Sequence, residues 1–429
     1  MFKRLAALAV LVLSPCANAQ VTLPAAPLTL DAAVDRVART HPDLRLLPLQ
    51  QQAARARFDA ASLAPPLVFG VDLENALGSG DSRGVDALET TVSLAGVLER
   101  GGKLDARRAV AQANLDALAP QREIIRLDMM AEVARRYLAI TLAAARQRIA
   151  LDDIEQRRRA VQAAQLRLTA GASPASTLIT AQAALAQAEL DRDRALQEGS
   201  AARLSLAALW NAREVDFDVA TGDPLQLPAL QDFSQLADLL ERTPELALIA
   251  GEQRVRQAQL QLASSQQRGD VSWQFGVRND RASRDSSLVG SFSVPLGNAR
   301  RADPELRAAR SELEMSGVER QGRALQLHAT LAEAHGRYST ARLEVTRMDR
   351  DVLPQLRRAE KAAETAWRAG AISYLEWAQL QAMRIEARQR QLDAALSAQL
   401  ALIELQRLTG QPLVATATAT ATATEGTAP

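Results

Sequence analysis

The chain has 429 residues, with 51 lysines and arginines against 50 aspartates and glutamates, and a formal net charge of +1. This near-balance excludes the basic surface of a nucleic-acid-binding protein. Hydrophobic residues make up 47% of the chain but aromatic residues only 3%, which favours long, closely packed, alanine-rich helices over a large globular core.

The N-terminus has the pattern of a secretory signal peptide. Two basic residues open it, an apolar run follows over 5–13, and small residues at 17–19 supply a cleavage site. We therefore expect residues 1–19 to be removed. The single cysteine, Cys16, lies inside this segment, so the mature chain would have no thiol for disulfides or metal sites. Lipidation of Cys16 is an alternative, which the proline before it disfavours.

Sequence signals recur in the same order in two halves of the chain. Three pairs carry this pattern: Pro-acid-Leu at 42–44 and 244–246, Phe-Gly-Val at 69–71 and 275–277, and Ala-Gly at 170–171 and 369–370. We interpret the chain as duplicated. The expected divisions are a signal peptide (1–19), a first repeat (20–212), a linker rich in Pro and Asp (213–231), a second repeat (232–412) and a disordered Ala/Thr tail (413–429).

Each repeat is predicted to contain a short helix, two strands and then two very long helices. Residues 121–170 contain no Gly or Pro, and apolar residues recur there at three- and four-residue steps, which indicates one continuous helix. At about 1.5 Å per residue this helix would be roughly 75 Å long. It is predicted to break at Gly171 and to return from Pro174. In the second repeat we expect a kink at Pro354 and an unbroken return helix over 371–409.

The turns between the long helices have residues suited to a chain reversal. Gly171 and Gly370 allow the backbone to turn after a helix, and Ser173 and Ser373 suit the N-cap of the returning helix. Pro174 suits a first helical turn.

Four segments change from helical periodicity to a period of two, with one apolar and one mostly polar side, at 67–74, 88–94, 271–278 and 288–294. A soluble sheet with one buried face would explain alternation alone. However, the long helices offer nothing to bury such a face, and each segment has about the length of a tilted membrane strand. The apolar positions are predicted to face lipid: Phe69, Val71, Trp273, Phe275 and Phe292. The polar positions are predicted to face a lumen: Asp72, Glu74, Gln274 and Arg278.

Four strands are too few to close a barrel, and lipid tolerates no unpaired strand edge. The chain must then complete its barrel with copies of itself. Two copies would give about eight strands with a filled interior, and three would give about twelve with room for a lumen. A duct requires three, so we expect a homotrimer. The predicted fold is mainly α, with long antiparallel helical hairpins and four strands per chain in a shared membrane barrel.

Several segments carry a resemblance to a known family. The most specific are Trp367-Arg-Ala-Gly-Ala-Ile-Ser-Tyr-Leu-Glu-Trp377 and Leu402-Ile-Glu-Leu-Gln-Arg-Leu-Thr-Gly410. Over roughly 28–412 the chain resembles the outer-membrane efflux factors, or TolC-like channels. Leu98-Glu-Arg-Gly-Gly-Lys103 is similar to the branch that serves cobalt–zinc–cadmium and similar heavy-metal pumps, and Ser293-Val-Pro-Leu-Gly-Asn298 fits the same place in the second repeat.

The resemblance implies a trimeric, non-enzymatic exit duct in the bacterial outer membrane, with a helical tunnel across the periplasm. A periplasmic adaptor and an inner-membrane pump of the resistance-nodulation-division type would dock at the ends of the helical hairpins. These ends would also form the closed gate, with Gly171, Ser173, Pro174, Gly370, Ser373, Tyr374 and Glu376 as its residues. By threefold symmetry Glu376 would form an acidic ring that favours cations. Heavy-metal cations and organic solutes remain alternatives as cargo.

No catalytic or metal-ligating pattern stands out in the sequence. His41, His328 and His335 are the only histidines, and the last two lie about 10 Å apart along one helix, too far to share a metal. We expect no cofactor, no metal site, no enzymatic activity and no nucleic-acid partner. A periplasmic coiled-coil adaptor or scaffold is the alternative class, and export of proteins or drugs is the alternative within the channel class.

Overall fold

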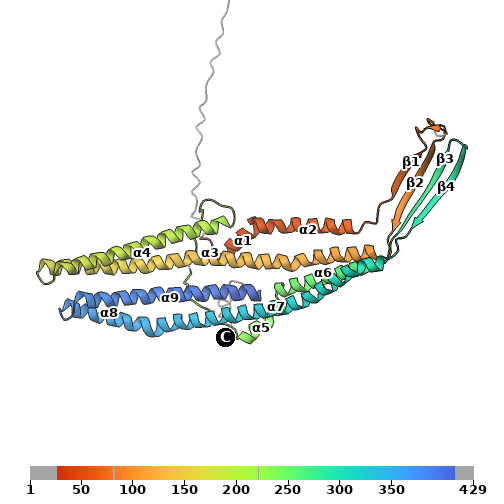
Figure 1. Cartoon of the computed structure of the whole chain (residues 1–429). Helices are drawn as coiled ribbons and strands as arrows, with labels where there is room; N and C mark the ends of the chain where they lie inside the picture. The colour runs from red at the N-terminus through yellow and green to blue at the C-terminus, as the bar shows by residue number, and fades with distance from the viewer. Residues whose placement is uncertain (1–26, 81–82, 221, 411–429) are drawn as a thin grey trace, which may run out of the picture.

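The computed structural model describes residues 27–80, 83–220 and 222–410. The expected signal peptide and tail lie outside these residues. The molecule is an elongated helical bundle with a sheet at one end and the turns of two helical hairpins at the other (Figure 1).

The same order of elements occurs twice along the chain. The first half contains α1 (Leu30–Thr40), α2 (Pro42–Ala61), β1 (Val68–Glu74), β2 (Glu89–Leu98), α3 (Lys103–Thr169) and α4 (Ala175–Ala208). The second half contains α5 (Phe233–Leu240), α6 (Pro244–Ser265), β3 (Val271–Asp280), β4 (Asp285–Ser293), α7 (Asn298–Arg347), the π-helical turn η2 (Met348–Val352), α8 (Leu353–Arg368) and α9 (Tyr374–Thr409).

The first long helix is longer than its sequence pattern indicated. α3 has 67 residues and is about 100 Å long at 1.5 Å per residue. It begins at Lys103 rather than near residue 121 and continues through Pro120. A proline inside a helix removes one backbone hydrogen bond. α3 packs against both α2 and α6, and this tertiary packing outweighs the local preference to break.

The second long helix contains one irregular turn. Along α7 the buried residues follow steps of four and three: Leu327, Leu331, Ala334, Tyr338, Ala341 and Val345. The next buried position is Leu353, eight residues after Val345 instead of the seven of a heptad. The π-helical turn η2 lies in between. Pro354 lacks the N–H that would donate to Arg350 in an α-helix, which favours the wider turn here. The irregularity expected at Pro354 therefore lies directly before it.

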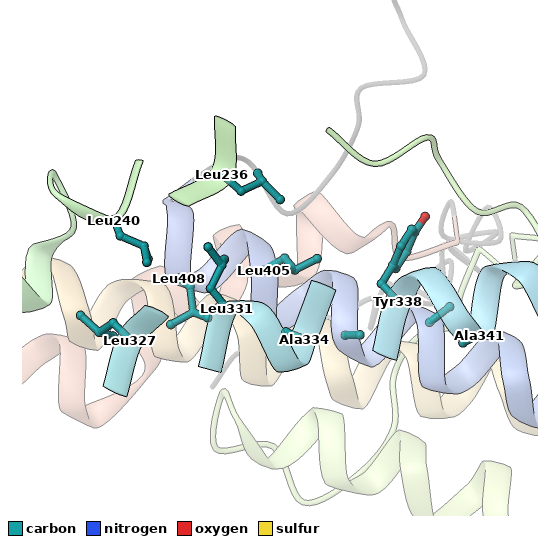
Figure 2. Close-up of a cluster of buried hydrophobic side chains, with 11 residues drawn as sticks. Leu236, Leu240, Leu327, Leu331, Ala334, Tyr338, Ala341, Leu405 and Leu408 are labelled. Carbon is teal, nitrogen blue, oxygen red and sulfur yellow. The ribbon is translucent and has the colours of Figure 1, made fainter. Parts of the chain in front are cut away.

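A cluster of buried side chains fixes the short helix α5 against α7 and α9. Leu236 and Leu240 of α5 pack with Leu327 and Leu331 of α7 and with Leu408 of α9 (Figure 2).

Tyr338 completes this cluster. It is fully buried, and its hydroxyl donates a hydrogen bond of 2.5 Å to the carbonyl of Pro228. In the first half, the Tyr137 hydroxyl lies 2.6 Å from the carbonyl of Ala220 and 3.1 Å from that of Leu28. Both long helices thus hold the segment that joins the two halves.

The strands form one antiparallel sheet in the order β1-β2-β3-β4. β2 pairs with β3, so the inner pair joins the two halves of the chain. The sheet follows α2 and α6 and leads into α3 and α7, which places it beyond the end of the helical bundle (Figure 1).

Candidate functional site

The sheet has one apolar face made of residues from all four strands. Phe69 is paired with Leu94, and Leu94 with Phe275. Trp273 is paired with Phe292 in the same way. Partners across a pair share a face, so the register brings the five predicted lipid-facing residues together. Phe275 remains 52% exposed and Phe69 69% exposed, so no other part of the described chain covers this face.

The opposite face carries the polar residues. Asp72 is paired with Thr91, and Thr91 with Arg278. Arg278 forms ion pairs with Glu89 at 3.1 Å and with Glu74 at 3.5 Å. It also donates a hydrogen bond to the Thr91 hydroxyl at 3.2 Å.

Gln274 lies on this polar face as well, paired with Ala95 of β2 and Ser291 of β4. The four predicted lumen residues are therefore on one face, but the lumen itself stays a prediction.

The motif that follows β2 connects the sheet to the bundle. Gly101 and Gly102 have φ of 80° and 73°, and a Cβ on Gly101 would lie 2.8 Å from the carbonyl oxygen of Ser265. Only glycine fits this turn without strain. Lys103 then forms an ion pair of 2.8 Å with Asp270, which also accepts a hydrogen bond from the backbone N–H of Arg100 at 3.0 Å.

Asp270 was not singled out by the sequence, because it lies in a loop with no pattern around it. Arg107, one turn into α3, binds Glu99 of the same motif. The motif thus has a structural role in fixing the angle between β2 and α3.

We call the two turns at 170–174 and 369–373 the hairpin ends. At each of these turns the first helix is terminated by a glycine in the left-handed conformation, with φ of 67° at Gly171 and 80° at Gly370. Ala172 N–H donates to the Arg167 carbonyl at 2.8 Å, and Ala371 N–H donates to the Ala366 carbonyl at 2.9 Å. Both are the six-to-one bonds that close a Schellman motif.

The helices that leave the hairpin ends begin differently. Ser373 caps α9: its hydroxyl accepts from the Glu376 N–H, and the Glu376 carboxylate accepts from the Ser373 N–H at 2.8 Å. These bonds lower the pKa of Glu376.

The predictions for Ser173 and Pro174 were wrong. Pro174 is itself the N-cap of α4, with an extended backbone, and no side chain caps that helix. Pro174 lies three residues after Gly171, as Ser373 lies three residues after Gly370, so α4 and α9 begin at equivalent places. Proline has no side-chain oxygen, so α4 lacks the cap that Ser373 gives α9.

An aromatic cluster lies directly behind the second hairpin end. Trp367 and Trp377 stack with ring centroids 4.6 Å apart, and Tyr374 meets both edge-on at 5.9 Å. Ala160 and Ala164 of the first hairpin pack against this cluster. Burial raises the pKa of Tyr374, whose hydroxyl has no hydrogen-bond partner among the described residues. Tyr374 is therefore a packing residue, which the sequence did not reveal.

Ion pairs join the two hairpins along the seam between α3 and α9. They include Arg135–Glu404 at 3.2 Å, Arg146–Asp393 at 3.1 Å and Arg388–Asp152 at 2.9 Å. Each advance along α3 is matched by a step back along α9, as two antiparallel helices require.

Nearer the hairpin ends the charges are buried. Asp153 and Arg157 form an ion pair of 3.1 Å with both side chains about one tenth exposed. Burial raises the pKa of Asp153, although Arg157 opposes this. Arg384 of α9 pairs with Glu360 of α8, whose pKa burial also raises.

The histidines have structural contacts. The ring nitrogen Nδ1 of His41 accepts a hydrogen bond of 3.2 Å from the Asp43 N–H at the start of α2. His328 and His335 meet Phe233 edge-on at 5.3 and 5.6 Å. In the described part of the chain, no group of three or more His, Cys, Asp or Glu is arranged to hold a metal ion. Among the helices of residues 27–80, 83–220 and 222–410, none combines the length and hydropathy needed to cross a membrane.

Comparisons with known proteins agree on one family and fold. Residues 33–212 match the model of the outer membrane efflux protein family. Over 388 residues the chain is 25% identical to the cobalt-zinc-cadmium resistance protein CzcC of Cupriavidus metallidurans, covering 90% of this chain and 91% of that protein. Among solved structures, CusC superposes with a TM-score of 0.76 at 19% identity, over 89% of this chain and 92% of CusC. The outer-membrane channel OprN superposes with a TM-score of 0.76 at 20% identity, over 90% of each chain.

Proposed function

We infer that the chain is the outer-membrane channel subunit of a tripartite efflux pump, because residues 33–212 match the outer membrane efflux protein family and most of the chain is similar to CzcC. The observation that carries this function is the sheet at the end of a bundle with the fold of known outer-membrane channels. One face of that sheet is apolar and exposed, and the other is polar. A channel wall needs this arrangement, with one face toward lipid and one toward water.

The sheet is further proposed to be one third of a twelve-stranded barrel. β1 and β4 are its edge strands, and each would pair with an edge of a neighbouring copy, because unpaired edges are not tolerated in lipid. Phe69, Val71, Trp273, Phe275 and Phe292 would then face lipid. Asp72, Glu74, Gln274 and Arg278 would line the lumen.

The hairpin ends are proposed to form the periplasmic entrance. Gly171, Ser173, Pro174 and Gly370 would lie at the surface that a periplasmic adaptor and a resistance-nodulation-division pump approach. Tyr374 would support this surface from behind, since it is buried. Ser373 and Glu376 would lie on the rim, and three copies of Glu376 would form the acidic ring.

Heavy-metal cations are the proposed cargo. This rests on the similarity to CzcC, a protein named for cobalt, zinc and cadmium resistance, and on the motif over 98–103. Organic solutes are the alternative. The passage of metal would not require a resident site in this chain.

Two measurements test the proposal. The first is the native mass of the detergent-extracted protein from outer membranes, where a trimer is expected and a soluble monomer would favour the scaffold alternative. The second is the survival of a strain that lacks its own channel and expresses this chain with its pump, on cobalt, zinc or cadmium and, separately, on organic toxins. Protection from the organic compounds alone would reject the metal cargo and keep the channel.

A further inference from the structure

A pocket between α3, α8 and α9 lies beside the aromatic cluster. It has a volume of about 250 Å³. Its lining includes five cationic side chains and two carboxylates. The pocket is therefore strongly positive although the chain as a whole is almost neutral.

The two carboxylates are already engaged by cations of the same pocket. Glu360 pairs with Arg384, and Glu364 pairs with Arg368 at 2.5 Å. Arg357 and Lys361 of α8 line the same pocket and have no ion-pair partner among the described residues. Arg159, the remaining cation, pairs at 3.8 Å with Glu155, which lies outside the lining. Arg357 and Lys361 are therefore the cations of the pocket that are free to receive an anion.

Two buried polar groups in the lining also lack partners. Trp377 is 4% exposed and Gln381 2% exposed, and neither the indole N–H nor the amide oxygen has a hydrogen-bond partner in the described chain. Leaving such groups unpaired costs about 1–3 kcal/mol each. The indole N–H is a donor and the amide oxygen an acceptor, and both atoms are enclosed by protein. A ligand that offers both an acceptor and a donor would satisfy the two once these side chains turn toward the pocket.

We propose that this pocket binds a small anion with several carboxylates and a hydroxyl group, of the hydroxy-polycarboxylate class. Its carboxylates would lie against Arg357 and Lys361 and accept from Trp377, and its hydroxyl would donate to Gln381. The volume exceeds that of several water molecules, at about 30 Å³ each, and is large enough for such an anion. This site is independent of the channel function, since the binding requires only the folded helical hairpins.

The test is calorimetric titration of citrate into the full chain in detergent, with acetate at equal ionic strength as the reference. Citrate is expected to bind and acetate to give no saturable heat. The double variant R357Q/K361Q should bind citrate about tenfold more weakly or worse, since each charge-assisted bond is worth more than 1.4 kcal/mol. Arg358 is adjacent but does not line the pocket, so R358Q should bind as the parent does.

Two further experiments test the uncharged contacts, which are those of the ligand with Trp377 and Gln381. Trp377→Phe keeps the ring but removes the N–H, and should weaken citrate binding while the thermal unfolding midpoint without ligand stays close to that of the parent. Tricarballylate has the three carboxylates but no hydroxyl and should bind more weakly than citrate. Equal losses in R358Q and R357Q/K361Q, or equal heats from acetate and citrate, would mean general screening of charge and would overturn the site. Neither outcome would bear on transport, which is measured separately.

Discussion

Arg167, near the end of α3, donates a hydrogen bond of 2.7 Å to the backbone carbonyl of Trp367, near the end of α8 and 200 positions later in the chain. Its guanidinium also lies 5.4 Å from the centre of the Trp367 ring. One side chain thus joins the ends of the two hairpins. We predict that Arg167→Met removes both contacts and lowers the local free energy of opening by about 1–2 kcal/mol.

Hydrogen exchange followed by mass spectrometry measures this effect. Amides over 361–377 should exchange about 5–30-fold faster in the variant, while those near Tyr338 should not change. Arg158→Met is the matched control, because Arg158 is exposed and only reaches Glu189 of its own hairpin at 3.5 Å. Equal acceleration in both variants would show that Arg167 does not join the hairpin ends.

Phe275 and Gln274 are neighbours on β3 that face opposite sides of the sheet. If the apolar face meets lipid, Phe275→Arg near the middle of the bilayer should cost about 2–4 kcal/mol. Gln274→Arg should destabilise the folded protein far less, because residue 274 would face the water-filled lumen. The amount of folded protein recovered from outer membranes, after extraction of loosely bound protein, measures the difference. Similar recovery of both variants would contradict the assignment of the two faces.

The capping box of α9 should depend on pH through Glu376. Bonds from the Ser373 N–H and hydroxyl lower the pKa of this carboxylate in the folded state. A lowered pKa means that the stabilisation is present above the unfolded pKa, about 4.3, and is lost as the pH falls through the folded value. Exchange of amides over 373–377, corrected for intrinsic rates, should therefore rise below about pH 4.

Glu376→Gln provides the control for this pH effect. Glutamine can still accept the capping bonds but does not titrate, so its exchange should not vary with pH in this way. An acceleration at low pH that persists in the variant would assign the effect to other groups.

Tyr338→Phe should destabilise the packing of the joining segment. The substitution removes the hydroxyl from a fully buried site and leaves the Pro228 carbonyl without its donor. We expect a loss of about 1–2 kcal/mol in the free energy of unfolding, measured by denaturant titration in detergent. Tyr338→Leu should cost more, since it also removes ring volume from the cluster of Figure 2. A fully stable Phe variant would mean that water replaces the hydroxyl.

The sheet is the part of the fold that the sequence predicted best. Alternation at Phe69, Trp273 and Phe275 was enough to place these residues on one face, because side chains in a strand have a strict period of two. The pairing of β2 with β3 was not predictable in the same way. It joins residues from different halves of the chain, and no local pattern encodes which strands become neighbours.

Helix boundaries were predicted less well because they depend on packing. The sequence indicated a continuous helix only over the proline-free residues 121–170, yet α3 begins at Lys103 and passes through Pro120 between α2 and α6. Pro174 and Ser373 occupy equivalent positions, three residues after Gly171 and Gly370, and each is the N-cap of the returning helix. Only Ser373 caps its helix with a side chain, because proline has no side-chain oxygen. The burial of Asp153 and Arg157 also depends on the second hairpin, which lies far away in sequence.

The turn η2 has a consequence for how the second hairpin tolerates changes in length. A single inserted residue in an ordinary α-helix rotates everything beyond it by about 100°, which would turn the packed stripe of α8 away from α9. Here one surplus residue between Val345 and Leu353 is absorbed inside the wide turn, and the stripe resumes in phase. The π-helical turn therefore compensates for the extra residue and keeps the buried residues of α8 facing α9. Removing Arg350, together with Pro354→Ala, should give a continuous α-helix with every buried contact kept, whereas removing Arg337 should shift the contacts from Tyr338 to Val345 out of phase.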